Sequence, residues 1–210
     1  MQPMPGGLVI AFEGIDGAGK TTQLELVRGE LQAADRPVLV LRNLGGTPIG
    51  EALREVMLSP LKRPPLTDFF VSLAIQEPLL EVIDNARAEG KIILLDRSPL
   101  SLAAYQIYGT GIDESIGWQH VQSGMDRIKP DAVILYNTDV ETALSRAQEA
   151  TGRSDYFESK SPEYFNKVAE GYRIVAERYP AIKAIDASQH ISEIHSQTMA
   201  LISPLLTGKP

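Results

Sequence analysis

Five short apolar runs stand out along the chain, each flanked by glycine, aspartate or proline and none alternating with polar residues. Runs of this kind are typical of strands that are buried on both faces of a sheet. The pattern predicts strands at residues 8–12, 38–41, 92–95, 133–135 and, more weakly, 182–185.

Segments with helical periodicity lie between these runs. A helix is expected over residues 22–33. Another is expected over about residues 191–206, as a cover of the sheet or, less favoured, as a dimer element. Pro78 lies inside a further helical pattern, where it predicts a kink or a late helix start. Other helix starts are indicated by a hydroxyl residue before proline or by a capping box. They are Thr47-Pro48, Ser98-Pro99, Ser161-Pro162 and Thr138 with Glu141.

Strand and helix alternate throughout the chain, which predicts the fold class. The alternation is typical of an α/β domain with a doubly wound parallel sheet of about five strands and helices on both faces. No long linker, composition shift or internal repeat divides the chain, so residues 1–210 are expected to form a single domain. The polar, breaker-rich stretch at residues 150–161 is either an ordinary surface connection or a short lid over a site.

The composition excludes several functional classes. With 20 Lys and Arg against 27 Asp and Glu, the 210 residues carry a net charge of −7, which argues against a nucleic acid polymer as partner. The chain has no cysteine, so disulfides, thiol nucleophiles and Cys-ligated metals are excluded. No long apolar run or signal peptide is present, so we expect no membrane segment and a cytoplasmic location.

A glycine-rich loop follows the first predicted strand. Residues 14–21 match the phosphate-loop pattern G-x-x-x-x-G-K-[ST] and precede a predicted helix, which indicates a P-loop NTPase-type fold. Glycines allow successive backbone N–H groups to surround a phosphate chain, and the helix N-terminus adds its positive dipole end. The predicted nucleotide-binding residues are Gly14, Ile15, Asp16, Gly17, Ala18, Gly19, Lys20, Thr21 and Thr22.

The third predicted strand is followed by an acid and a base, Asp96 and Arg97. An acid at the end of an apolar strand resembles the second element of phosphate-loop proteins, so Thr21 and Asp96 are the predicted magnesium-binding residues. Taken alone, an aspartate at a strand end is more often a helix cap or a turn residue, and the phosphate loop is what favours the magnesium role of Asp96. Arg97 lies where open α/β sheets bind ligands, and its planar guanidinium suits a phosphate.

Four stretches of the chain resemble the thymidylate kinases, a family of nucleoside monophosphate kinases. They are residues 12–22, 45–54, 96–106 and 129–131, in the family's order and at family-like spacing. The resemblance implies transfer of the terminal phosphoryl group of ATP to a deoxynucleoside monophosphate, dTMP in the first place. It also implies Mg²⁺ as cofactor and a homodimer.

Position by position, the resemblance implies roles for individual side chains. Lys20 and the loop amides would hold ATP, Asp16 would lie beside the acceptor sugar, and Arg97 would bind the acceptor phosphate. Tyr105 would lie where a ribose 2′-hydroxyl would clash. Further acceptor contacts implied in this way are Phe70, Ser101 and Gln106.

A basic residue is also expected from the lid. Some family members carry an arginine inside the phosphate loop, whereas this chain has Ala18 at that position. The resemblance therefore implies that an arginine in or near the lid takes part in catalysis. Arg153 is the first candidate and Arg146 the second.

Departures from the family pattern lie around the acceptor base. Asn43 and Leu44 replace an acid and a proline, and Leu102 stands where a polar residue is usual. The alignment places Ile75 where the family has a base-reading arginine. Loss of hydrogen-bond partners predicts weaker discrimination between bases, by about 1–3 kcal/mol for each partner left unsatisfied.

The sequence is also compatible with two other functions. One is a related nucleotide kinase with a different acceptor, and the other is a nucleotide-binding relative without catalysis. A carboxylate base for a hydroxyl acceptor is missing at residues 42–44, which favours a phosphate acceptor because its second pKa of about 6 leaves it largely deprotonated. A GTP-binding switch is disfavoured, because the Asn-Lys pair at residues 166–167 lacks the acid of a guanine-binding motif.

Overall fold

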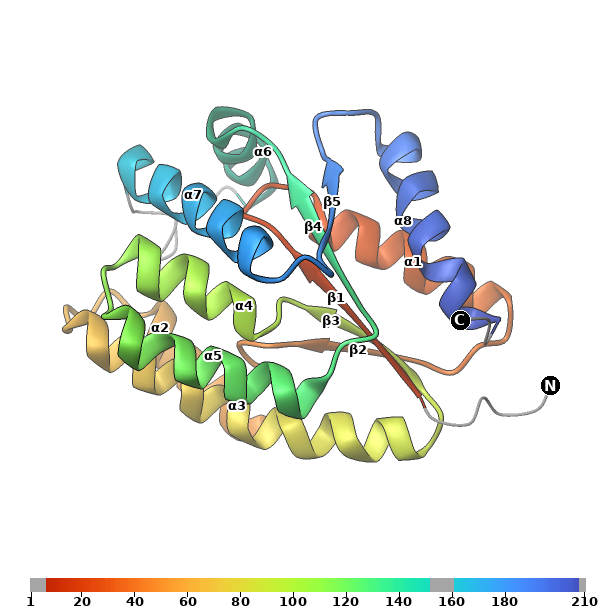
Figure 1. Cartoon of the computed structure of the whole chain (residues 1–210), viewed down its shortest axis with the longest axis horizontal. Coiled ribbons are helices and arrows are strands. Elements are labelled where there is room, and N and C mark those ends of the chain that lie inside the picture. Colours follow the sequence, from red (N-terminus) through yellow and green to blue (C-terminus); the bar gives the residue numbers. More distant parts are fainter. Residues whose placement is uncertain (1–6, 152–160, 208–210) are drawn as a thin grey trace.

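A central sheet of five parallel strands organises the computed structural model, which describes residues 7–151 and 161–207 (Figure 1). The strands are β1 (Leu8–Glu13), β2 (Val38–Arg42), β3 (Ile92–Asp96), β4 (Ala132–Asn137) and β5 (Lys183–Asp186). Their spatial order is β2-β3-β1-β4-β5, with Leu8 opposite Ile92 and Ile10 opposite Ala132. The five predicted strands and the doubly wound parallel sheet are confirmed.

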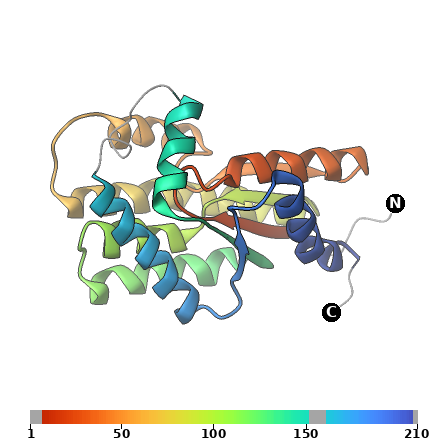
Figure 2. The ribbon, with the colours of Figure 1, turned by 90° about the horizontal axis from the view of Figure 1, so that it is seen from above.

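Helices cover both faces of this sheet (Figure 2). Helices α1 and α8 pack together on one face, and α3, α5 and α7 lie on the other. Among the helices of the described ranges, none is both long and apolar enough to cross a membrane. The helices are α1 (Lys20–Ala33), α2 (Pro48–Leu58), α3 (Pro65–Ala88), α4 (Pro99–Leu102), the π-helical turn η1 (Ala103–Gly109), α5 (Glu114–Ile128), α6 (Val140–Thr151), α7 (Pro162–Arg178) and α8 (Ile191–Leu206).

Successive residues of β1 face opposite layers of the molecule. Ile10 and Phe12 belong to the core that includes α1 and α8, whereas Val9 and Ala11 belong to the cores formed with helices of the other face. All four side chains are fully buried. Because neighbouring strand residues point to opposite faces, a strand that is covered on both sides needs an unbroken apolar run, which is the pattern seen in the sequence.

The predicted helix starts are confirmed in three of four cases. Thr47 caps α2 and Ser98 caps α4 by accepting hydrogen bonds from backbone N–H groups, and α7 begins directly after Ser161. The capping box at Thr138 is wrong. Because β4 runs on to Asn137 and α6 begins at Val140, the preceding residue, Asp139, takes the cap and accepts a 2.7 Å hydrogen bond from the Thr142 N–H.

Helix α3 passes through Pro78 without interruption, so the predicted late start is wrong. The helix begins at Pro65, because the fixed φ of proline suits a first helical position. Phe69, Leu79 and Ile83 are buried along its inner face. Tertiary packing of an apolar face outweighs the local cost of one internal proline, because packing supplies most of the stability of helices in proteins.

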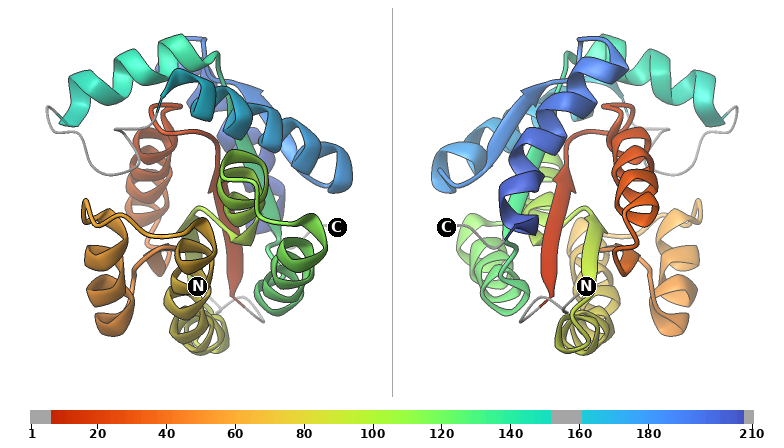
Figure 3. Two further views of the ribbon diagram at one scale, coloured as in Figure 1. Left: turned by 90° about the vertical axis from the view of Figure 1, so that its left-hand side faces the viewer. Right: turned by 90° about the vertical axis from the view of Figure 1, so that its right-hand side faces the viewer.

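Helices α2 with α3 and helix α6 lie on opposite sides of β1 and so leave the carboxyl ends of the strands between them (Figure 3). Helix α6 contains the first two residues of the predicted lid at 150–161. Residues 152–160, and with them Arg153, lie outside the described residues.

Candidate active site

A cavity of about 840 Å³ opens at the carboxyl ends of the strands, which is the edge where open α/β sheets bind ligands. One wall comes from α2 and α3, and the opposite wall comes from α6 and the start of α8. The floor consists of residues that follow β1, β2 and β3. The cavity lining includes Asp16, Gly17, Gly19, Lys20, Thr21, Thr22, Asn43, Leu44, Met57, Leu58, Ser72, Gln76, Asp96, Arg97, Ser101, Leu102, Tyr105, Gln106, Arg146 and Ile191.

The phosphate loop needs glycine for conformation and for close packing. Gly17 has a φ of 80°, and a Cβ there would lie 1.8 Å from the carbonyl oxygen of Ala143 in α6. Six of the predicted loop residues line the cavity, from Asp16 to Thr22 with the exception of Ala18. Gly14, Ile15 and Ala18 are not among the residues that line it and are buried.

Lys20 is held at the centre of this loop. Its side chain is almost fully buried, and the ammonium donates a 2.7 Å hydrogen bond to the carbonyl of Ile15. Burial and the charge of Arg97 together lower the pKa of Lys20 to about 8, against the opposing effect of nearby carboxylates. Two cations that are buried close together favour an anion between them, which is what a phosphate chain supplies.

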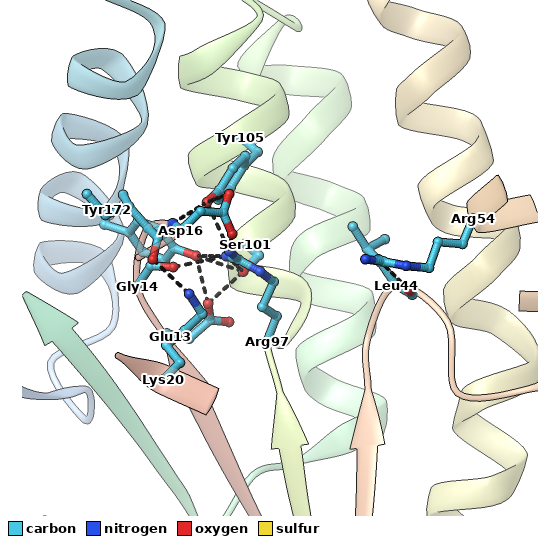
Figure 4. Close-up of polar contacts among 11 residues, drawn as sticks. Glu13, Gly14, Asp16, Lys20, Leu44, Arg54, Arg97, Ser101, Tyr105 and Tyr172 are labelled. Atoms are coloured by element: carbon cyan, nitrogen blue, oxygen red, sulfur yellow. Dashed lines mark hydrogen bonds and ion pairs between the residues drawn. The ribbon is translucent and has the colours of Figure 1, made fainter. Parts of the chain in front are cut away.

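Arg97 occupies a strained position at the end of β3. Its φ of 67° lies in the left-handed region, which non-glycine residues rarely adopt and which is frequent at functional sites. The guanidinium lies 4.7 Å from the centre of the Tyr105 ring. Its hydrogen bonds go to Asp16 Oδ1 (2.5 Å), Tyr172 OH (2.9 Å), Gly14 O (3.0 Å), Tyr105 OH (3.0 Å) and Ser101 Oγ (3.3 Å) (Figure 4).

Asp16 and Tyr105, which both accept hydrogen bonds from Arg97, are also bonded to each other (Figure 4). The Tyr105 hydroxyl donates a 2.9 Å hydrogen bond to Asp16 Oδ2 and accepts one of 3.2 Å from the Asp16 N–H. Burial raises the pKa of Asp16, but the charges of Arg97 and Lys20 outweigh this and bring it to about 2. Burial also raises the pKa of the Tyr105 phenol. Asp16 is therefore ionised and Tyr105 protonated at neutral pH.

A buried carboxylate that sequence reasoning missed lies beneath Arg97. Glu13, at the end of β1, is 1% exposed. Its Oε1 accepts from the Ser98 N–H (2.6 Å) and the Ser98 hydroxyl (2.7 Å). Its Oε2 accepts from Ser101 Oγ (2.6 Å) and Tyr172 OH (2.9 Å). An acid at the last position of an apolar strand was the available signal for Glu13.

Tyr172 is the contribution of α7 to the same network. Its hydroxyl lies 2.8 Å from Ser101 Oγ and also bonds Arg97 and Glu13. Burial and the negative charge of Glu13 raise the pKa of the Tyr172 phenol, so it keeps its proton. No local sequence signal indicated this role, because Tyr172 lies within an ordinary helical pattern and meets Arg97 only through the tertiary fold.

The structure changes the expected residues of the α3 wall. Ile75 is fully buried in the protein interior, and Gln76, one position later, lines the cavity. Phe69 is also fully buried, whereas Phe70 is 52% exposed and is not among the residues that line the cavity. Phe70, which the resemblance implied as an acceptor contact, is therefore not brought to the cavity.

The opposite wall holds the second arginine candidate. Arg146 lines the cavity, and its guanidinium donates a 2.9 Å hydrogen bond to the carbonyl of Ala187. Ile191, at the start of α8, lies on the same side and accepts a 3.0 Å hydrogen bond from the Gln23 side chain. Arg146 is therefore half-buried in the cavity wall, with its guanidinium hydrogen-bonded to the backbone.

One carboxylate in the cavity is suited to a divalent cation. Asp96 Oδ1 is buried and accepts no hydrogen bond from the described residues, and Thr21 lines the same cavity. Within residues 7–151 and 161–207 there is no cluster of three or more His, Cys, Asp or Glu side chains that could hold a metal. A single free carboxylate oxygen beside the phosphate loop suits Mg²⁺, because this ion is commonly bound by one or two carboxylates together with substrate phosphates.

Comparison with known protein families supports one assignment. The family model described as thymidylate kinase matches residues 12–198. The thymidylate kinase of Pelotomaculum thermopropionicum is 33% identical over 204 residues, covering 95% of this chain and 94% of the relative. That of Pseudomonas fluorescens is 37% identical over 205 residues, covering 95% and 97%.

The fold has a counterpart among solved structures. The crystal structure of thymidylate kinase from Ehrlichia chaffeensis aligns with a TM-score of 0.75 at 26% sequence identity. The alignment covers 95% of this chain and 100% of that one.

Proposed function

The chain belongs to the thymidylate kinase family and transfers the terminal phosphoryl group of ATP to dTMP, and we propose which of its residues carry out the transfer. The observation that carries this assignment is the convergence of Lys20, Asp16 and Arg97 at the phosphate loop, in the middle of the cavity. The two nucleotides would then occupy opposite ends of the cavity, with their phosphates meeting beside these residues.

The strand order supports this division of the cavity. Helices α6 and α8 follow β4 and β5 on one side of β1, so Arg146 and Ile191 would lie beside the ATP base. Arg97 follows β3 on the other side, next to β2, so the acceptor would extend from Arg97 towards α2 and α3. Ser101, Tyr105 and Gln106 line the cavity between these two ends.

Positioning and charge neutralisation account for the transfer. The acceptor phosphate displaces Asp16 from part of its contact with Arg97, and Asp16 then lies free to accept a hydrogen bond from the acceptor sugar. An acceptor phosphate oxygen forms a bond to the terminal phosphorus of ATP as the bond to the bridging oxygen breaks, and ADP leaves. Lys20 and the loop amides stabilise the charge on the transferred group, as phosphoryl transfer requires. A deprotonated phosphate needs no strong general base.

Magnesium is the proposed cofactor. Thr21 and Asp96 would hold it, and the unpaired Oδ1 of Asp96 supports this. When bound, the ion neutralises charge on the ATP phosphates. An Asp96→Asn variant is expected to need at least tenfold more Mg²⁺ for half-maximal rate, whereas the exposed Asp84→Asn control is expected to behave as wild type. An unchanged Mg²⁺ dependence in Asp96→Asn would contradict the assignment.

An acceptor panel tests the catalytic proposal. Purified protein is incubated with ATP, Mg²⁺ and, separately, dTMP, dUMP, other monophosphates and free thymidine, and ADP formation is measured. We expect product with dTMP, at least a thousandfold loss in Lys20→Ala, and no loss in the exposed control Lys62→Ala. ATP binding without product from any acceptor would identify a non-catalytic relative. Product from another acceptor alone would refute dTMP as the substrate.

A homodimer is also proposed, through exposed apolar side chains of α2 and α3. Ile49 and Val56, seven residues apart, form a row on α2, and Leu66 and Phe70, four residues apart, form a row on α3. Solvent-exposed apolar rows on adjacent helices are typical of association surfaces. Sedimentation velocity is expected to show a dimer that Phe70→Glu dissociates and Ile116→Glu, on α5, does not. A monomeric wild type would refute the proposal.

A cytoplasmic location stays a prediction.

A further inference from the structure

The acceptor end of the cavity contains two carboxamides among mostly apolar side chains. Met57, Leu58 and Leu102 supply the apolar wall. Asn43 and Gln76 are the carboxamides, at 3% and 6% exposure. Buried amides are normally hydrogen-bonded, so an unpaired one needs an explanation.

Both carboxamides retain free hydrogen-bonding groups. Within the described part of the chain, the Gln76 side chain makes no hydrogen bond, and Asn43 Oδ1 is buried without a partner. The nearby Ser72 hydroxyl is not available as a donor, because it donates to the Asp68 carbonyl at 2.8 Å. The wall therefore offers amide groups to whatever fills this end of the cavity.

Gln76 is held in place by packing. A Cβ at Gly124 of α5 would lie 2.4 Å from Gln76 Nε2, so the glycine leaves room for the carboxamide between α3 and α5. The two helices set the position of the side chain, while its amide makes no hydrogen bond to the described residues. The amide can also turn over, because neither orientation breaks an existing hydrogen bond.

A carboxamide carries one donor group and one acceptor group side by side. The edge of a 4-oxo pyrimidine, as in dTMP, offers the O4 acceptor next to the N3–H donor. The edge of a 4-amino pyrimidine, as in dCMP, offers the N4–H donor next to the N3 acceptor. Turning the amide by half a turn exchanges its two groups, so one glutamine is complementary to both bases. A guanidinium only donates and would favour the 4-oxo base.

We propose that Gln76 determines base specificity by reading this edge, and that the protein phosphorylates dCMP as well as dTMP. The proposal rests on the function proposed above, since it places the acceptor base beside α2 and α3. The chemistry is the same for both acceptors. A phosphate oxygen of the monophosphate bonds to the terminal phosphorus of ATP, the bond to the bridging oxygen breaks, and ADP leaves, while the base takes no part.

Steady-state kinetics of the full chain with dTMP, dCMP and dGMP test the proposal. For wild type we expect kcat/KM with dCMP within about a hundredfold of that with dTMP, and far above that with dGMP. Gln76→Met keeps a similar size without the amide. It is expected to raise KM for dTMP and dCMP alike by about tenfold or more, with KM for ATP unchanged.

A second variant separates the role of the amide from a general loss of packing. Gln76→Arg is expected to retain dTMP turnover and to raise the dTMP to dCMP preference at least tenfold, because arginine cannot accept a hydrogen bond. The exposed Gln119→Met on α5 serves as the matched control and is expected to equal wild type.

The outcomes distinguish the role of Gln76 and the turnover of dCMP from the kinase function itself. Turnover of dTMP without turnover of dCMP in wild type overturns this proposal and leaves the kinase function standing. Wild-type KM values for dTMP and dCMP in Gln76→Met, or an unchanged dTMP to dCMP preference in Gln76→Arg, overturn the role of Gln76. Loss of turnover with every monophosphate overturns the proposed function itself.

Discussion

The hydroxyl of Tyr172 is the link between α7 and the arginine that we assign to the acceptor phosphate. It bonds Arg97 Nη1 and Glu13 Oε2 at 2.9 Å each, and both partners are charged. Replacing Tyr172 with phenylalanine removes only the hydroxyl. Arg97 keeps its other bonds but loses the one that fixes it from the α7 side, so we expect the variant to fold and to bind the acceptor less well.

The size of this effect follows from the bonds that are lost. A hydrogen bond to a charged group contributes about 1.5–3 kcal/mol. When the free energy of the bond to Arg97 is lost from acceptor binding, kcat/KM for dTMP falls by about 10- to 100-fold, because each factor of ten corresponds to about 1.4 kcal/mol. The fall is expected as a higher KM for dTMP, with kcat and the KM for ATP close to wild type. Loss of the hydrogen bond to the buried Glu13 carboxylate is also expected to lower the free energy of unfolding by about 1–3 kcal/mol.

A second buried tyrosine provides the control for this experiment. Tyr136 is 1% exposed, and its hydroxyl lies 3.0 Å from Thr198 Oγ1, away from Arg97. Tyr136→Phe is expected to lower the free energy of unfolding by about 1 kcal/mol without changing the KM for dTMP. Equal KM values for dTMP in Tyr172→Phe, Tyr136→Phe and wild type would refute a positioning role and leave Tyr172 as a structural residue.

Two further predictions concern the phosphate loop. Since the pKa of Lys20 is about 8, its ammonium is present below that pH and is lost above it. We therefore expect kcat/KM for ATP to fall about tenfold per pH unit above pH 8 in wild type and not in Lys20→Arg. A flat wild-type profile to pH 9.5 would contradict this. Gly17→Ala adds a clash with Ala143 to backbone strain, whereas Gly19→Ala, at a φ of 87° with open space around its Cβ, adds strain alone. Urea unfolding is expected to show losses of about 2–5 kcal/mol for Gly17→Ala and about 1–2 kcal/mol for Gly19→Ala, and equal losses would disprove the close approach of the loop to α6.

Much of the fold follows from local sequence patterns, because those patterns are set by short-range physics. Strands that are buried on both faces need unbroken apolar runs, and all five were predicted from such runs. The phosphate loop is contiguous, so its position at residues 14–21 could be predicted from spacing alone. The position of Arg97 followed from its place after an apolar strand, since the carboxyl ends of parallel strands meet at one edge.

The predictions from the sequence failed where the local structure depends on how other elements extend or pack. The cap at Asp139 depends on how far β4 extends, and the course of α3 through Pro78 depends on the packing of its buried face. Ile75 and Gln76 are neighbours on α3, yet Ile75 is buried in the protein interior and Gln76 lines the cavity. Rotation of a helix is set by the surfaces it packs against, and no local pattern of α3 fixed it to one residue.

The sequence by itself therefore determined the sheet, the phosphate loop and the donor chemistry of this protein, because each resides in a continuous stretch of chain. Only the tertiary structure decided which residues surround the end of the cavity that we assign to the acceptor. Glu13, Tyr172 and Gln76 come from β1, α7 and α3, and they act on the site through contacts with residues far away in the sequence. Such contacts depend on how helices pack around the sheet, and that packing is a property of the whole chain.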